Sequence, residues 1–174
     1  SANNFLYVFG DDSINVFSDL RVTATGSTVF TNTNVSASIG SRLPYAVFPY
    51  FRSVLLMNDY GMYALVGSTT SKISDQLDGI FPLIDFTLPV TGGQVLLNNI
   101  LCAAFSFTYN DPSVGPRAIQ AVFFEKKWFI TSQGALTYVT SVPLSGLINL
   151  YGTTGKDLKR LYGDSAASIN STIK

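Results

Sequence analysis

The sequence predicts an all-β fold in which antiparallel hairpins form propeller-like blades. Three observations predict it: short apolar runs bounded by turn residues, recurrence of this pattern along the chain, and few charged residues. Only 13% of the 174 residues are charged, whereas soluble domains average roughly 25%. With 47% hydrophobic residues, the chain can form one domain with a sizeable core. We therefore expect residues 1–174 to be a single β-rich domain, and part of a longer propeller protein.

The hairpin pattern occurs in four parts of the chain. FLYVFGDDSINVFS spans residues 5–18, and SVLLMNDYGMYALVGSTTSKIS spans residues 53–74. AVFFEKKWFITSQGALTYVT (121–140) and GLINLYGTTGKDLKRLYG (146–163) follow. Each contains short runs rich in Val, Ile, Phe, Tyr and Leu that end at Gly, Asn, Asp or Ser, which is typical of consecutive antiparallel hairpins.

The spacing of these units favours a partial propeller. Units that start near residues 5, 53 and 100 lie about 47 residues apart, close to the length of a four-stranded propeller blade. Three or four blades do not comfortably close a ring, so the first and last would be left uncovered. A β-sandwich or barrel also explains the strand pattern and stays the alternative.

One stretch departs from the β pattern. In SKISDQLDGIF (71–81), Ile73, Leu77 and Ile80 recur at spacings of four and three, and Ser74 and Asp75 are suitable caps. We expect one short helix there. The prolines lie at the margins of the apolar runs, where a missing N–H costs no ladder hydrogen bond; they are Pro44, Pro49, Pro82, Pro89, Pro112, Pro116 and Pro143.

The net charge of the chain excludes strong long-range attraction to nucleic acid or to an anionic membrane. Eleven basic and eleven acidic residues give zero formal charge, which provides no general field for nucleic acid or an anionic membrane. A solvated surface is favoured over a nucleic-acid groove for the clustered cations, namely Lys126, Lys127, Lys156, Lys159, Arg160 and Lys174. No apolar run is long enough to span a membrane, and no signal peptide is visible.

The single cysteine indicates a core position. Cys102 lies within the apolar run ILCAAFSF (100–107) and cannot form an intrachain disulfide. The chain therefore has no disulfide framework, which favours assembly in a reducing cytoplasm.

The absence of histidine excludes many catalytic sites. Ser-His and Cys-His nucleophiles and His-ligated metals all require this residue. A glycosidase could still use paired carboxylates. The candidate acids are Asp11, Asp12, Asp59, Asp75, Asp78, Asp85, Asp111 and Glu125. All except Asp85 occur in turn-like or capping contexts, where structural roles are favoured. We expect no enzyme activity and no catalytic residue.

Two ligand motifs are also incomplete. Asp11 and Asp12, with Ser13 and Asn15, offer oxygen atoms for calcium but lack the carboxylate spacing of a recognised loop. GTTGK (152–156) does not have the phosphate-loop spacing and is interpreted as a hairpin turn. We expect no metal or cofactor site.

Aromatic residues suggest a sugar-binding face as an alternative. The candidates are Tyr45, Tyr50, Tyr60, Tyr63, Trp128, Tyr138 and Tyr151. Most of them alternate with other apolar residues and are expected to pack in the sheets, with Trp128 as a core anchor.

Part of the chain resembles a known family. The shared pattern is a strand ending in FGDDSINVF (9–17), an apolar strand at Val54 to Met57, a second at Met62 to Val66, and Ile73-Ser74 followed by Ile80-Phe81. These motifs, across roughly residues 5–84, resemble the tail hub proteins of short-tailed phages, also called packaged-DNA stabilisation or head-closure proteins. The rest of the chain resembles them more loosely.

The resemblance implies a structural, ring-forming component of the virion, assembled in the host cytoplasm. Its partners would be portal and other tail proteins, further copies of itself and nearby packaged DNA, whose channel the ring would seal. The family carries no catalytic motif. A carbohydrate- or receptor-binding tail module is the second hypothesis, and a glycosidase is the third.

Overall fold

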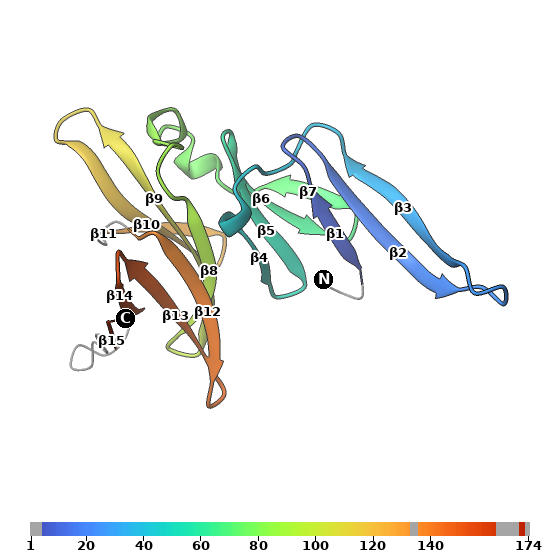
Figure 1. The fold of residues 1–174 in the computed structure, drawn as a ribbon. Helices are drawn as coiled ribbons and strands as arrows, with labels where there is room; N and C mark the ends of the chain where they lie inside the picture. Colours follow the sequence, from blue (N-terminus) through green and yellow to red (C-terminus); the bar gives the residue numbers. More distant parts are fainter. Residues whose placement is uncertain (1–4, 133–135, 163–170, 173–174) are drawn as a thin grey trace.

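The computed structural model describes residues 5–132, 136–162 and 171–172, and within them the protein is all-β. Fifteen strands form four separate antiparallel sheets, none of which closes on itself (Figure 1). The all-β prediction is therefore confirmed.

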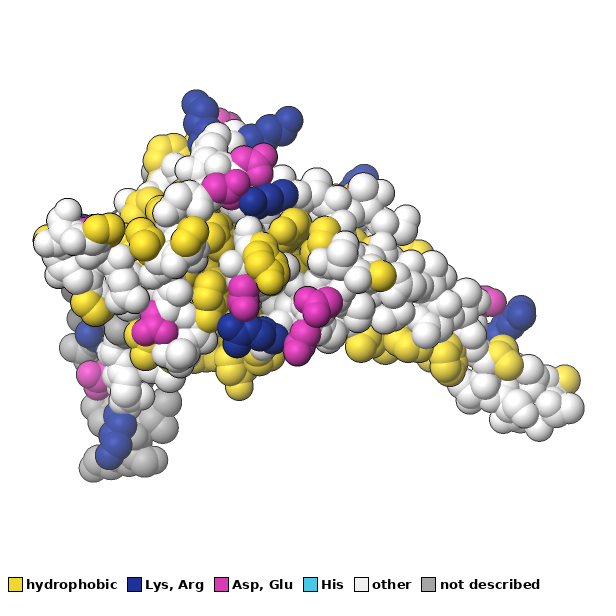
Figure 2. Space-filling model, turned by 90° about the horizontal axis from the view of Figure 1, so that it is seen from above, with side chains coloured by type: hydrophobic (Ala, Val, Ile, Leu, Met, Phe, Trp, Pro, Cys, Tyr) yellow, Lys and Arg dark blue, Asp and Glu magenta, His cyan; other side chains and the backbone are white. Residues whose placement is uncertain are grey.

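The first sheet contains three strands, in the order β1 (Leu6–Phe9), β2 (Ile14–Val22) and β3 (Thr28–Ser36). The second contains β4 (Val47–Tyr50), β5 (Ser53–Asn58), β6 (Gly61–Val66) and β7 (Thr69–Lys72). The β2 and β3 hairpin extends beyond the other strands, and we call it the arm (Figures 1 and 2).

The third sheet contains β8 (Thr91–Leu97), β9 (Ile100–Asp111), β10 (Gly115–Phe124) and β11 (Lys127–Ser132). The fourth contains β12 (Tyr138–Leu144), β13 (Leu147–Thr154), β14 (Asp157–Leu161) and β15 (Ser171–Thr172). In every sheet each strand pairs with the next along the chain, which is the up-and-down order of a propeller blade.

Three apolar layers separate the four sheets. The layer between the first and second sheets contains Ile14, Val54, Leu56 and Leu65. The layer between the second and third contains, among others, Phe48, Leu55, Met57, Met62, Phe105 and Phe107. The layer between the third and fourth contains Val95, Cys102, Ala104, Val122, Leu136, Val139, Leu150 and Leu161. The sheets thus pack face to face in chain order.

The two middle sheets bury both of their faces. In β5, Val54 and Leu56 contact the first layer, whereas Leu55 and Met57 contact the second. This arrangement explains why β5 is a nearly continuous apolar run, since successive side chains point to opposite faces of a strand. A strand with one solvated face would instead show alternating apolar and polar residues.

The short helix expected over residues 71–81 is not present as an α-helix. Residues 71–72 belong to β7, and two 3₁₀ helices follow, η2 (Asp75–Leu77) and η3 (Phe81–Leu83). Leu77 is buried, and Ile73 and Ile80 pack against the same core, so the apolar face was predicted correctly. Pro82 lies inside η3, and proline cannot donate the backbone hydrogen bond that a continuing helix needs.

The predicted caps of this helix are also wrong in part. Ser74 precedes η2, but its side chain makes no capping hydrogen bond. Its Oγ instead accepts a hydrogen bond of 3.0 Å from the Met62 backbone N–H in β6. Ser74 is fully buried, so this bond attaches the 3₁₀ segment to the second sheet.

Hydrogen bonds also cross the apolar layers. The Tyr50 hydroxyl of the second sheet donates to the Leu101 carbonyl of the third, at 2.9 Å. Ser141 in β12 both accepts from the Gln94 N–H at 2.7 Å and donates to the Gln94 carbonyl at 2.8 Å. The hydroxyl of Ser141 thereby satisfies backbone groups on the free edge of β8.

β8 approaches its neighbours closely because it contains two consecutive glycines. A Cβ atom on Gly92 would overlap the ring of Phe48 in β4. On Gly93 it would lie 2.7 Å from Leu150 Cδ1 and 2.8 Å from Ser141 Oγ. Both distances are too short for a carbon contact, so the packing of the third sheet against both neighbours requires glycine here.

Replacing either glycine should therefore destabilise the protein. We expect Gly92→Ala and Gly93→Ala each to lower the free energy of unfolding by about 1–3 kcal/mol, the usual cost of overpacking. Urea denaturation measures this change. Gly79→Ala is the matched control, since a Cβ there meets nothing within 4 Å. Equal stability of all three variants would contradict the close approach.

Candidate functional site

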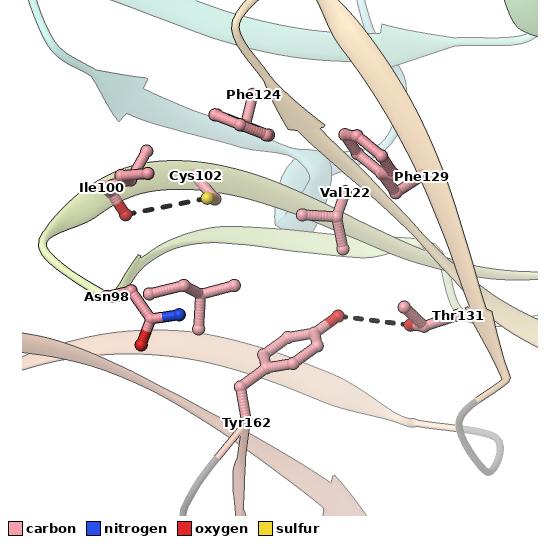
Figure 3. Close-up of a pocket in the computed structure, with 9 residues that line it drawn as sticks. Asn98, Ile100, Cys102, Val122, Phe124, Phe129, Thr131 and Tyr162 are labelled. Atoms are coloured by element: carbon pink, nitrogen blue, oxygen red, sulfur yellow. Dashed lines mark hydrogen bonds between the residues drawn. The ribbon is translucent and has the colours of Figure 1, made fainter.

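A pocket opens between the third and fourth sheets, with a volume of about 470 Å³ (Figure 3). It is lined by Leu97, Asn98, Ile100, Cys102, Val122, Phe124, Phe129, Thr131 and Tyr162. Most of these residues belong to one face of the third sheet, and Tyr162 follows β14 of the fourth. Its size lies within the range of small-molecule pockets, and its lining is mainly apolar.

The mouth of the pocket is formed by exposed apolar side chains and a tight turn. Ile100 is 43% exposed and Phe129 is 47% exposed. The rings of Phe124 and Phe129 stack at 5.7 Å across the turn between β10 and β11. Asn98 and Asn99 both have positive φ, which suits the two-residue loop between β8 and β9.

The inner end of the pocket is polar. Tyr162 reaches from the fourth sheet toward Thr131, and the two hydroxyls lie 3.4 Å apart (Figure 3). The Tyr162 hydroxyl also donates a short hydrogen bond to Gln120 Oε1. Burial raises the pKa of Tyr162, so the phenol stays protonated and remains a hydrogen-bond donor at neutral pH.

A row of polar side chains continues from this end across the third sheet. Thr131 pairs with Gln120, Gln120 with Ser106, and Ser106 with Thr91. Gln120 and Thr91 are fully buried. Gln120 Nε2 and Thr91 Oγ1 have no hydrogen-bond partner within the described residues. Buried polar atoms without a hydrogen-bond partner are uncommon because they lower the stability of the fold. This polar row is therefore unusual inside an otherwise apolar layer.

Cys102 lines the pocket and is 4% exposed, which confirms the predicted core position. Its Sγ lies 3.6 Å from the Ile100 carbonyl oxygen, to which the thiol donates. Burial raises the pKa of the thiol above its ordinary value, so the nucleophilic thiolate is scarce at neutral pH.

A second hollow lies where the first strands of three sheets converge. Its volume is about 290 Å³, and its lining comes from β4, β8, β12 and the preceding 3₁₀ helix η1 (Pro44–Ala46). Two exposed tyrosines, Tyr45 and Tyr138, meet edge to face there, with ring centroids 5.1 Å apart. Gln94 and Thr140 line the same hollow.

The outer face of the first sheet is apolar and uncovered. We define the outer face by Leu6, Val8, Phe17 and Phe30; Leu6, Val8 and Phe30 are 54%, 44% and 55% exposed. Phe17 and Phe30 contact each other edge to face, with ring centroids 5.2 Å apart. Figure 2 shows hydrophobic side chains gathered along one side of the arm. The opposite face of this sheet carries Tyr7 and Phe9 into the first apolar layer.

Several of the candidate acids have structural partners. Asp59 accepts hydrogen bonds from Arg42, and Asp78 forms an ion pair of 2.7 Å with Lys72. Asp111 accepts from the Ser113 backbone N–H at 2.8 Å, and this bond helps to lower the pKa of the carboxyl. Asp111 therefore stabilises the turn between β9 and β10.

Asp85, expected to lie outside turns, is in fact a turn residue. Its Oδ1 accepts from the Thr87 hydroxyl at 2.6 Å and from the Thr87 N–H at 3.0 Å. These bonds lower the pKa of Asp85. The sequence could have indicated this turn, because Asp followed two residues later by Thr, with Pro89 nearby, is a common turn composition.

The other candidate acids lie at chain reversals. Asp11 and Asp12 are exposed in the bend between β1 and β2, and Asp75 is in the first turn of η2. Glu125 has positive φ in the turn between β10 and β11. In the described ranges, no cluster of three or more His, Cys, Asp or Glu residues could hold a metal ion.

The basic and aromatic candidates divide between surface and core. GTTGK (152–156) contains a hairpin turn, as predicted: its last two residues, Gly155 and Lys156, join β13 to β14. Lys159 and Arg160 point to opposite faces of β14. Lys174 lies outside the described residues.

Tyr50 is buried, and Tyr63 and Trp128 pack against apolar clusters. The Trp128 indole donates to the Ile73 carbonyl at 2.7 Å. Tyr151 is half-buried, whereas Tyr45, Tyr60 and Tyr138 are exposed, so the expected packing holds for most of the seven candidates but not for these three.

Comparisons with known proteins do not identify a family. No family model matches the chain, and no curated protein matches it. In the portion of the chain that is described, no helix has the length and apolar character needed to cross a membrane.

The polar end of the pocket should contribute measurably to stability. Tyr162→Phe removes the donor to Gln120 and leaves a buried amide with fewer partners, so we expect a loss of about 1–3 kcal/mol in the free energy of unfolding. Urea denaturation measures it. Tyr60→Phe is the control, since Tyr60 is 73% exposed and should change little. A Tyr162→Phe variant as stable as the control would mean that the Gln120 contact is unimportant.

Proposed function

We propose that this protein is a structural component of a phage tail or head-closure hub that connects portal and tail. One observation carries the proposal: the outer face of the first sheet is apolar and uncovered, whereas both faces of the second and third sheets are buried. Contiguous exposed apolar patches mark interaction surfaces in folded proteins. The resemblance of residues 5–84 to phage hub proteins supplies the biological setting.

The kind of surface supports an assembly role. The apolar faces of the second and third sheets are covered by another sheet, as in the layer that contains Phe105 and Phe107. The outer face of the fourth sheet, like that of the first, leaves apolar side chains exposed, among them Leu144 and Leu147. The outer face of the first sheet presents the same kinds of residue as the covered faces, so another protein surface would complete it. A connector needs rigid sheets and large contact areas and does not need catalytic turnover. The partners we propose are portal and other tail proteins, and the location is the virion.

Co-assembly with portal and tail proteins of the phage that encodes the chain tests this role. We expect a complex of defined mass by light scattering after mixing. Leu6→Lys and Val8→Lys should weaken the complex at least about tenfold, because each places a charge in a desolvated contact. Val114→Lys is the matched control, since Val114 is 68% exposed at a distant turn. Failure to associate with any of these proteins would contradict the proposal.

A carbohydrate-binding tail module is the second candidate, and the Tyr45 and Tyr138 pair favours it. Aromatic rings can pack against the apolar face of a sugar while nearby polar groups bond its hydroxyls. Both tyrosine hydroxyls and the side chains of Gln94 and Thr140 have no hydrogen-bond partner among the described residues. The hollow that they share is concave and mixed in polarity.

A glycan array separates this candidate from the structural role. If the hollow binds sugar, Tyr45→Ala and Tyr138→Ala should each lower the signal at least about tenfold, since each loses a stacking or hydrogen-bonding contact. Tyr60→Ala controls for loss of an exposed tyrosine elsewhere. An array without signal, or signal unchanged in the two variants, would count against sugar binding in this hollow.

A further inference from the structure

β3 has a long strand edge with no partner strand among the described residues. It spans nine residues, Thr28–Ser36, and contains no charged residue and no proline. Figure 1 shows this strand at the outside of the molecule, away from the second, third and fourth sheets. An unpaired edge presents backbone N–H and C=O groups that can pair with another strand. Its threonine, valine and phenylalanine residues also favour extended structure.

Other described sheet edges carry features that discourage pairing. β7 has only four residues and ends in Lys72, and β11 begins at Lys127. β4 and β12 contain Pro49 and Pro143, which cannot donate a ladder hydrogen bond. The free edge of β8 is bonded by Ser141. Short length, charge and proline are usual means by which proteins block sheet edges, and β3 has none of them; its two register shifts flank residues 31–34 and leave that segment regular.

The sequence of β3 is nearly the same in both directions about Asn32. In TVFTNTNVS, an antiparallel pair of two copies centred on Asn32 places Val29 opposite Val35 and Thr31 opposite Thr33. Asn32 then lies opposite its own copy. Cross-strand pairs of threonines and of β-branched residues are favourable. The match is best at the centre, since Phe30 would face Asn34 and the two valines lie at or beyond the register shifts that flank residues 31–34.

The backbone around this centre is regular. Thr31, Asn32, Thr33 and Asn34 pair with consecutive residues of β2, and both register shifts of the sheet lie outside this segment. The side chain of Asn32 is exposed. Thus the central segment, which would make the first contacts, is accessible and extended.

We propose that a second copy of this chain binds by antiparallel pairing of the two β3 strands, about a two-fold axis that passes beside Asn32. The pairing would join two three-stranded sheets into one sheet of six strands. Such a contact is isologous, because each copy contributes the same residues. The backbone edge of β3 carries the pairing, whereas the side chain of Asn32 shares the outer face with Phe17, its partner in β2. Protection of the β3 amides is therefore the result that separates this pairing from a contact on the outer face.

Charges placed on the axis test this pairing directly. Asn32→Asp and Asn32→Lys each place like charges opposite each other, and we expect the dissociation constant of the dimer to rise at least about tenfold in either variant. An equimolar mixture of the two variants should restore association, because Asp then faces Lys. Sedimentation equilibrium over a wide range of concentrations measures all three samples and the unchanged chain.

Controls separate pairing at β3 from other forms of association. Asn110→Asp and Asn110→Lys change an exposed asparagine at the end of β9 and should leave the dimer unchanged. Circular dichroism confirms that each variant is folded. Amide hydrogen exchange of the unchanged chain requires no variant, and residues 28–36 should become more protected as concentration rises.

Three results would overturn the proposal. One is an unchanged chain that stays monomeric at all concentrations. Another is a dimer that is insensitive to charge at residue 32, or that the mixture of variants does not restore. The third is association without added protection of residues 28–36, which would assign the contact to another surface, such as the outer face of the first sheet.

Discussion

The structure depends on the burial of both faces of its two middle sheets. β5 and β9 send alternate side chains into different apolar layers, so neither strand has a face exposed to solvent, and the polar residues of β9, such as Ser106, are buried. Such strands must be nearly continuous apolar runs, which accounts for LLM in β5 and for LCAAF in β9. The close approach at Gly92 and Gly93 follows from the same constraint, because β8 packs between neighbours on both sides.

Sequence reasoning identified much of the fold because its signals were local. Turns such as Glu125-Lys126 and GTTGK are specified by neighbouring residues, and their hairpins were predicted correctly. The segment over 71–81 was misjudged because spacing of apolar residues cannot distinguish an α-helix from two 3₁₀ turns on the same core. In this segment, Pro82 and the buried hydrogen bond from the Met62 N–H to Ser74 Oγ favour two 3₁₀ turns over an α-helix.

The candidate sites were harder to predict because they join distant parts of the chain. Tyr45 and Tyr138 are 93 positions apart and meet only because the first strands of successive sheets converge. Tyr162 and Gln120 belong to different sheets, and no spacing rule links them. Among the pocket residues, Cys102 had a local signal in the sequence, because its apolar run indicated burial. The pocket that surrounds it depends on packing between sheets.

The first sheet combines an open apolar face with an open strand edge, whereas the fourth sheet shares only the open apolar face, with Leu144 and Leu147 exposed. The outer face of the first sheet is apolar, and the edge of β3 has neither charge nor proline, whereas other described edges are short, charged, interrupted by proline or bonded by a side chain. A face and an edge of one sheet point in perpendicular directions, since side chains stand out of the sheet and backbone hydrogen bonds lie within it. A partner on the outer face and a second copy along β3 could therefore bind together. Assembly through this sheet would extend in two directions while the pocket between the third and fourth sheets stays accessible.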